Sequence, residues 1–176
     1  MFEHILVLTD GSACADLALP YAADLARTYR SQLTVLYVVP EQLYPLASAE
    51  GLVTAYDPEA ERVRAVEEGA QLLEQARLLL DVPGANLVRR EAHGQSVAEV
   101  VAGEVELLGA GLVVMSTHGR SGLAHLFLGS VAEKVLQRVQ VPVFVVNASK
   151  AGAPKVSAQA GASGTKETRH PVQGQS

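Results

Sequence analysis

The stretch "LVVMSTHGRSGLAHLFLGSVAEKVLQRV", residues 112–139, decides the fold class. It begins with a run of aliphatic residues, passes through Gly119, Gly122 and Gly129, and ends in a segment with the apolar spacing of a helix. A continuous aliphatic run is typical of a strand that is covered on both faces, as in a parallel sheet. The stretch therefore predicts a β-strand over residues 112–116, a glycine-rich connection, and a helix that begins at Gly129-Ser130.

Four further segments, most of them short aliphatic runs, predict strands over residues 4–9, 32–39, 86–91 and 141–147. Segments with helical apolar spacing separate them, at residues 13–29, 58–80 and 97–108. Alternating strands and helices require right-handed crossovers. They predict an α/β fold: an open, doubly wound, five-stranded parallel sheet with strand order 3-2-1-4-5 and helices on both faces.

Residue types at the helix ends predict local structure. Ser96 with Glu99, and Ser130 with Glu133, each have the spacing of a capping box. Pro20 lacks a backbone N–H, so a kink or weak first turns are expected in the helix over residues 13–29.

Composition limits the function classes. Of the net charge of −5, residues 1–147 carry −8 and residues 148–176 carry +3. An acidic body argues against nucleic acid as the main partner, because that binding depends on Lys and Arg. The one cysteine, Cys14, excludes an internal disulfide and fits a reducing compartment. No apolar run approaches the length of a membrane span, so we expect a cytoplasmic protein.

Two segments lie outside the predicted core. Residues 1–147 are expected to form one α/β domain, and residues 148–176, rich in Ala, Gly, Ser, Lys and Gln, to be a disordered tail. The long connection over residues 40–56 either packs its apolar residues on the helices or covers a binding site.

The expected strand order also predicts where a ligand binds. Ligands of open α/β sheets bind beyond the carboxyl ends of the strands, at the point where the strand order reverses. The first and fourth strands flank that point, so Thr9 and Asp10 are expected to face Ser116, His118 and Gly119 across one crevice.

The glycines, the helix start and a cation near this crevice favour an anion site. Gly119 and Gly122 allow the backbone to approach a ligand closely. The helix that opens at Gly129-Ser130 directs N–H groups and the positive end of its dipole there, and Arg120 adds charge. The alternative is that Ser130 caps its helix and binds no ligand.

Three other polar residues have alternative roles. Asp10 holds a ribose, a base or a phosphate-bound cation, or else caps the first helix alongside Ser12. His118 acts as a general base or hydrogen-bonds its own loop. His4 is expected at the surface, at the start of a strand. No His, Cys and carboxylate set has metal-ligand spacing.

Three stretches resemble the universal stress protein family: "ILVLTDGS" at 5–12, "LTVLYVVP" at 33–40, and "MSTHGRSGLAHLFLGSVAEKVLQRVQVPVFVV" at 115–146. The resemblance covers about residues 1–147. The family's nucleotide-binding branch has a glycine, two residues, a glycine, nine residues, and then glycine with Ser or Thr. Gly119 and Gly129-Ser130 match this pattern, whereas Ser116 replaces its first glycine.

The resemblance implies an ATP-binding, dimeric stress-response protein that acts as a nucleotide-dependent sensor or adaptor. Adenine would lie against the backbone near Val38 and the side chain of Asp10, and the ribose near Ser116. Mg²⁺ or Mn²⁺ would bridge the phosphate oxygens, and the homodimer would form through residues 141–147. The triphosphate would lie over Gly119, Arg120, Gly122, Gly129, Ser130 and the amide of Val131.

Two other functions are compatible with this resemblance. Because Ser116 departs from the motif, a nucleotide-free dimeric interaction module of the same fold is the first alternative. A slow ATP hydrolase is the second, although no residue set that would position an attacking water is evident in the sequence.

Overall fold

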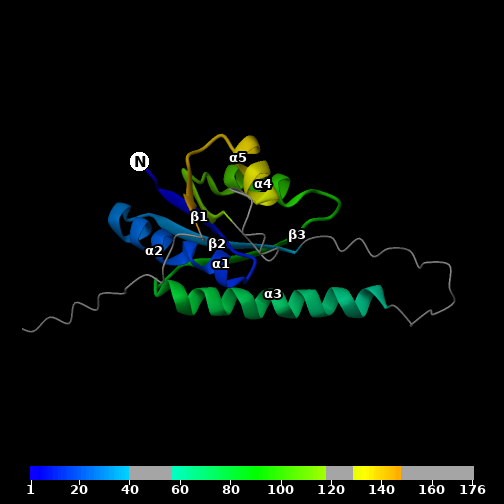
Figure 1. Cartoon of the computed structure of the whole chain (residues 1–176). Helices are drawn as coiled ribbons and strands as arrows, with labels where there is room; N and C mark the ends of the chain where they lie inside the picture. Colours follow the sequence, from blue (N-terminus) through cyan, green and yellow to red (C-terminus); the bar gives the residue numbers. More distant parts are fainter. Residues whose placement is uncertain (40–56, 118–128, 148–176) are drawn as a thin grey trace, which may run out of the picture.

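The computed structural model describes residues 1–39, 57–117 and 129–147. Five parallel strands form one sheet in the order β3-β2-β1-β4-β5, which confirms the predicted class and strand order (Figure 1). The strands are β1 (His4–Leu8), β2 (Gln32–Val39), β3 (Asn86–Glu91), β4 (Leu112–Ser116) and β5 (Val143–Val146).

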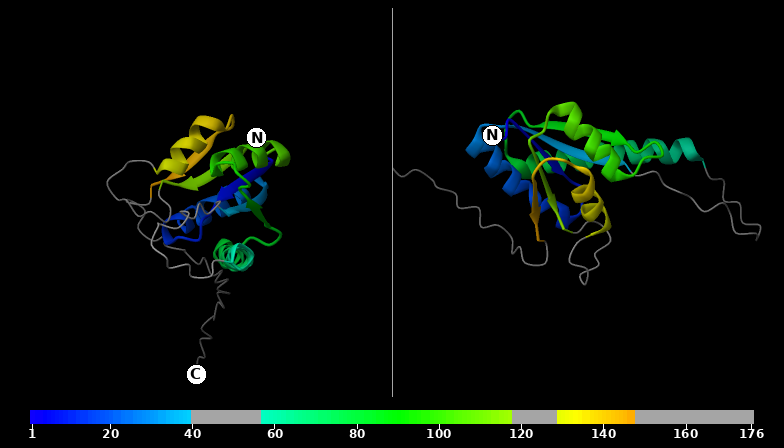
Figure 2. Two further views of the ribbon diagram at one scale, coloured as in Figure 1. Left: turned by 90° about the vertical axis from the view of Figure 1, so that its right-hand side faces the viewer. Right: turned by 90° about the horizontal axis from the view of Figure 1, so that it is seen from above.

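The helices lie on both faces of this sheet. They are α1 (Ala13–Asp16), α2 (Ala18–Tyr29), α3 (Pro58–Leu80), α4 (Val97–Leu108) and α5 (Ser130–Arg138). Helices α2 and α3 pack on one face, and α4 and α5 pack together on the other (Figure 2). Among the described residues, no helix has the length and apolar content needed to cross a bilayer.

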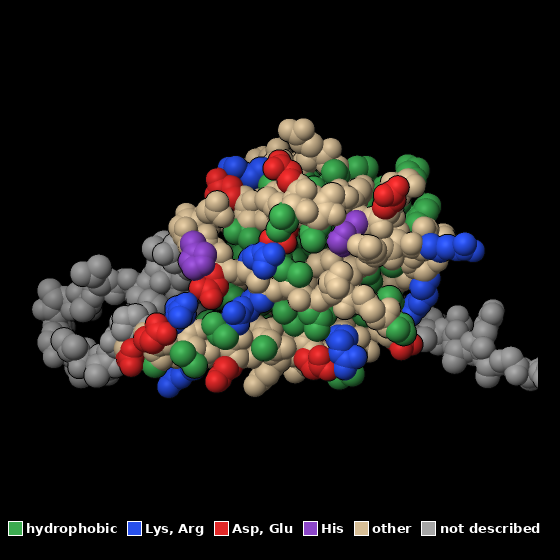
Figure 3. Space-filling model, turned by 180° about the vertical axis from the view of Figure 1, so that it is seen from behind, with side chains coloured by type: hydrophobic (Ala, Val, Ile, Leu, Met, Phe, Trp, Pro, Cys, Tyr) green, Lys and Arg blue, Asp and Glu red, His purple; other side chains and the backbone are tan. Residues whose placement is uncertain are grey.

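Alternation along the central strands divides the core into two layers. In β1, Ile5 and Val7 face α2 and α3, whereas Leu6 faces α4 and α5, and all three are completely buried. This two-sided burial explains why the central strands β1 and β4 are mostly aliphatic. Acidic and basic side chains instead occupy the outer side of the molecule over α3 (Figure 3), where Arg62 and Arg77 each pair with a glutamate three residues earlier.

The segment over residues 13–29 is two helices, not one. Helix α1 ends at Asp16 and α2 begins at Ala18, so the interruption lies at Leu17, three residues before Pro20. Without an N–H, Pro20 cannot donate to the carbonyl of Asp16, which weakens the helix at this turn.

One of the two predicted capping boxes is confirmed and the other is wrong. At α4, the Ser96 hydroxyl accepts the N–H of Glu99 and the Glu99 carboxylate accepts the N–H of Ser96. At α5 the extended residue before the helix is Gly129, and no side chain caps the helix. Ser130 is already the first helical residue, so its hydroxyl is one position too late to serve as the cap.

The expectation that His4 lies at the surface is also wrong. Its side chain is buried, and its Nε2 lies 2.7 Å from the hydroxyl oxygen of Thr34 on β2. Because β1 is the middle strand of the sheet, even its first residue is covered, and Gly111 donates its N–H to the His4 carbonyl from the β4 side.

Candidate functional site

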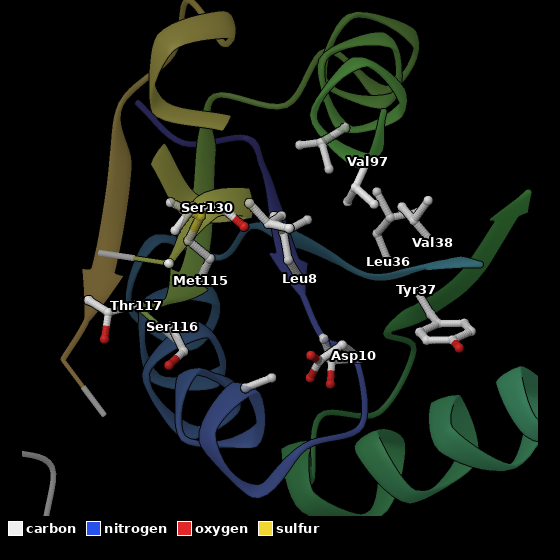
Figure 4. Close-up of a pocket in the computed structure, with 16 residues that line it drawn as sticks. Leu8, Asp10, Leu36, Tyr37, Val38, Val97, Met115, Ser116, Thr117 and Ser130 are labelled. Atoms are coloured by element: carbon white, nitrogen blue, oxygen red, sulfur yellow. The ribbon is translucent and has the colours of Figure 1, made fainter. Parts of the chain in front are cut away.

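A cavity of about 340 Å³ lies at the carboxyl ends of β1, β2 and β4 (Figure 4). This is the edge where the strand order reverses and where α/β sheets bind ligands. Its volume is within the range of small-molecule sites. It is lined by Leu8, Thr9, Asp10, Ala15, Leu36, Tyr37, Val38, Val97, Val101, Met115, Ser116, Thr117, Gly129, Ser130, Val131 and Ala132.

The structure brings many of the predicted site residues together in this one cavity. Residues that are far apart in the sequence line it: Thr9, Asp10, Val38, Ser116, Gly129, Ser130 and Val131. The other predicted site residues, His118, Gly119, Arg120 and Gly122, lie outside the described part of the chain.

Hydrogen bonds within the turn after β1 orient Asp10. The Thr9 hydroxyl accepts the N–H of Gly11 at 3.0 Å and donates to Oδ1 of Asp16 at 3.1 Å. Asp10 Oδ1 accepts the N–H of Ser12 at 3.0 Å, and the Ser12 hydroxyl caps α1 by accepting the N–H of Ala15. Ser12 is therefore the helix cap, and Asp10 is held at the cavity wall.

The carboxylate of Asp10 lies close enough to influence that of Asp16 in α1. Partial burial of Asp16 raises the pKa of its carboxyl group above the ordinary value, and the negative charge of Asp10 raises it further. The hydrogen bond from Thr9 acts in the opposite direction. Negative charge is therefore already costly beside this wall of the cavity.

Strand β2 runs past the end of β1 at the cavity. The last bond of their ladder is donated by the N–H of Thr9 to the carbonyl of Leu36, at 3.1 Å. Backbone groups of alternate residues point the same way, so the N–H and C=O of Val38 point into the space beyond β1. Val38 is only 8% exposed, yet among the described residues no backbone bond joins it to the β1 side. Within the described part of the chain, this nearly buried residue thus has a backbone donor and acceptor that face the cavity without a backbone partner.

The first turn of α5 forms the opposite wall. The N–H of Gly129 donates to the carbonyl of Thr117 at 2.7 Å, which fixes the start of the helix beside the end of β4. The first intrahelical bond runs from the N–H of Glu133 to Gly129, so the N–H groups of Ser130 and Val131 have no helical acceptor. They carry the positive end of the helix dipole to the cavity.

The sequence did not reveal the apolar wall. Leu36, Val97, Val101 and Met115 line the cavity, but their spacing is that of ordinary core residues. One signal was available: Val97 is the first residue of a helix that follows a strand, so it lies at the carboxyl edge of the sheet. The cavity therefore has an apolar part, formed by β2 and α4, and a polar part, formed by the ends of β1 and β4 and the start of α5.

Within residues 1–39, 57–117 and 129–147, no group of three or more His, Cys, Asp or Glu side chains could hold a metal ion. Among the described residues that line the cavity there is one carboxylate, that of Asp10, and no histidine, lysine or cysteine.

Comparison with known proteins identifies relatives of this chain. The model of the universal stress protein family matches residues 1–147. Universal stress protein YxiE of Bacillus subtilis is 32% identical over 148 residues, which are 83% of this chain and 99% of the relative.

Two solved structures have the same fold. The structure of MJ0577 from Methanocaldococcus jannaschii has a TM-score of 0.63 at 23% identity, and covers 84% of this chain and 96% of its own. A universal stress protein from Archaeoglobus fulgidus, solved in complex with dAMP, has a TM-score of 0.55 at 18% identity, and covers 82% of this chain and 97% of its own. With the family model spanning the whole described sheet, this chain belongs to the universal stress protein family.

Proposed function

We propose that this universal stress protein binds ATP in the described cavity and acts as a dimeric, nucleotide-dependent sensor or adaptor. The observation that carries the proposal is the backbone N–H and C=O of Val38, which have no backbone partner on the β1 side among the described residues. They share a cavity with N–H groups at the start of α5 that have no helical acceptor. The Val38 end of the cavity is suited to a flat base that has a donor and an acceptor, and the α5 end is suited to an anion.

The base fits the apolar part of the cavity. The edge of adenine presents an amino donor next to a ring nitrogen acceptor, which complements the C=O and N–H of Val38. Leu36, Val97 and Val101 supply the apolar surface for the ring, and the Asp10 side chain lies at its border. Guanine presents a carbonyl where adenine has its amino group, so it would place an acceptor against an acceptor.

The phosphates fit the start of α5. The N–H groups of Ser130 and Val131 and the helix dipole favour negative charge, and the resemblance adds Gly119, Arg120 and Gly122. Mg²⁺ or Mn²⁺ would be bound through the phosphate oxygens and would neutralise part of their charge. With a single carboxylate in the described lining, the proposal includes no catalytic step.

A thermal shift experiment tests ATP binding. Ligand at 100 times Kd stabilises a protein by about 2.7 kcal/mol, which for a domain of this size raises Tm by about 5–10 °C. Mg-ATP is compared with Mg²⁺ alone and with Mg-GTP, and the natively purified protein is analysed by mass spectrometry for bound nucleotide. No shift at millimolar Mg-ATP would refute the proposal.

We also propose that the dimer forms through β5, which is an edge strand of the sheet. The carbonyls of Pro142 and Val146 accept bonds from β4, so the backbone groups of Val143 and Val145 point outward. Phe144 is 40% exposed, and its ring lies 5.9 Å from that of Tyr21 on α2. Unpaired backbone groups beside exposed aromatic rings are suited to antiparallel pairing with a second copy about a two-fold axis.

The test of the dimer uses Val145→Pro, which removes one outward N–H and leaves the β4 ladder intact. Val145→Ala is the matched control, because it shortens the side chain but keeps that N–H. Sedimentation should show a dimer for the wild type and the alanine variant, and a folded monomer for the proline variant. A proline variant that is folded and dimeric would contradict pairing through β5.

A further inference from the structure

The spatial order of the cavity walls across the sheet indicates where the sugar of a bound nucleotide would lie. The base wall is at Val38 on β2, and the phosphate wall is at Gly129, whose N–H is bonded to Thr117 just after β4. Between them lie the ends of β1 and β4. The β1–β4 register pairs Val7 with Val114, and two residues further on it brings Ser116 beside Thr9.

The distances agree with this placement. Neighbouring strands are about 4.8 Å apart, so β2 and β4 are separated by about 10 Å, which is roughly the span from a base to its first phosphate. Ser116 is the last residue of β4 and is half-buried. In Figure 4 the Ser116 side chain lies on the opposite side of the view from Leu36, Val38 and Val97, and Asp10 lies between them.

We infer that Ser116 selects the sugar of the nucleotide: its hydroxyl forms a hydrogen bond with a ribose hydroxyl, so ribonucleotides bind more tightly than deoxyribonucleotides. This inference rests on the proposed nucleotide site. The fold does not determine the sugar by itself, because the relative from Archaeoglobus fulgidus holds dAMP, a deoxyribonucleotide. In this chain the choice is made by side chains at the end of β4.

The physical reason is the cost of covering a polar group. A serine hydroxyl has one donor and two acceptor positions, so it can bond a ligand in addition to a neighbour in the protein. A ribose replaces the water that this hydroxyl loses on binding. A deoxyribose covers the hydroxyl without replacing that bond, and sites built to bond a hydroxyl reject analogues that lack it.

The experiment measures Kd for Mg-ATP, 2′-deoxy-ATP and 3′-deoxy-ATP by calorimetry, with wild-type protein and Ser116→Ala. Wild type should prefer ATP over at least one deoxy analogue by about 3–10-fold, the usual effect of one hydrogen bond. Ser116→Ala should abolish this preference: it should weaken the binding of ATP, and it should leave the Kd of that analogue within about twofold of its wild-type value. The analogue that loses its disadvantage identifies the hydroxyl that Ser116 bonds.

Ser130→Ala is the matched control, because it removes the same hydroxyl at the phosphate end of the cavity. It should leave the ratio of ATP to deoxy-ATP affinities unchanged, even where it changes the affinity for both nucleotides. If wild type binds all three nucleotides equally, or if Ser116→Ala weakens all three by the same factor, the inference about Ser116 is wrong while the proposed function stands. If wild type binds none of them, both fail.

Discussion

Substituting Gly11 by alanine tests how the turn after β1 is held against α3. Gly11 has φ +75°, in the left-handed region, and lies between Asp10 and the cap of α1. A Cβ at this position would lie 2.2 Å from Cδ2, 2.8 Å from Cδ1 and 2.9 Å from Cγ of Leu72. Ordinary carbon contacts are about 3.5–4.0 Å. Since Cγ is also too close, rotating the end of the leucine does not remove the overlap.

The expected loss of stability has two parts. The left-handed backbone costs an alanine about 1–2 kcal/mol, and displacing Leu72 within the packed core costs about 1–3 kcal/mol more. Gly11→Ala should therefore lower the free energy of unfolding by about 2–5 kcal/mol, measured by urea titration followed by circular dichroism.

A matched control separates the two parts. Gly84 has φ +82°, and a Cβ there would meet nothing within 4 Å, so Gly84→Ala carries only the backbone cost. In a Leu72→Ala background, the loss of stability caused by Gly11→Ala should also fall to the backbone cost alone. A double-mutant cycle reports this difference as coupling between the two residues. Equal losses for Gly11→Ala and Gly84→Ala would refute the packing of α3 against this turn.

Three further changes test the site and its surroundings. The raised pKa of Asp16 means that the protonated carboxyl stabilises the folded protein, and this stabilisation is lost as pH rises through that pKa. Asp16→Asn should therefore become more stable relative to wild type between pH 3 and pH 7, measured by urea titration. A difference in stability that does not change with pH would contradict this. Ser96→Ala should lower the free energy of unfolding by about 0.5–2 kcal/mol in urea, since it removes half of the capping box, and no loss would show that the box is dispensable. Ser116→Gly should weaken ATP binding about 3–10-fold in calorimetry; a gain of affinity would instead favour the nucleotide-free interaction module, with Ser116 obstructing the pocket.

The sheet could be predicted from the sequence because burial on both faces leaves a direct trace. Each strand of this sheet falls within a predicted strand, and the bounds of α3 and α4 match the predicted ranges. The errors arose where three-dimensional neighbours decide the outcome. His4 is buried because β1 is flanked by β2 and β4. Gly129 stays outside α5 while its N–H is bonded to Thr117 at the end of β4, a contact between residues distant in the sequence.

The candidate site was predictable in its polar part and not in its apolar part. Asp10 and Ser116 follow strands that the expected order makes neighbours, so their meeting at one cavity followed from topology. Val97 and Val101 have the same spacing as core residues, and no pattern separates a valine that faces a cavity from one that faces another helix. The open backbone groups of Val38 depend on where β1 ends relative to β2, which periodicity does not define.

The bond between Gly129 and Thr117 has a consequence for how this protein can vary. The N–H of Gly129 donates to the carbonyl of Thr117 at 2.7 Å, so the end of β4 and the start of α5 are tied to each other. Lengthening a segment whose ends are already tied costs little entropy, about 0.6 kcal/mol for each doubling. Insertions between these two anchors should therefore leave the stability of the sheet and of both core layers largely unchanged.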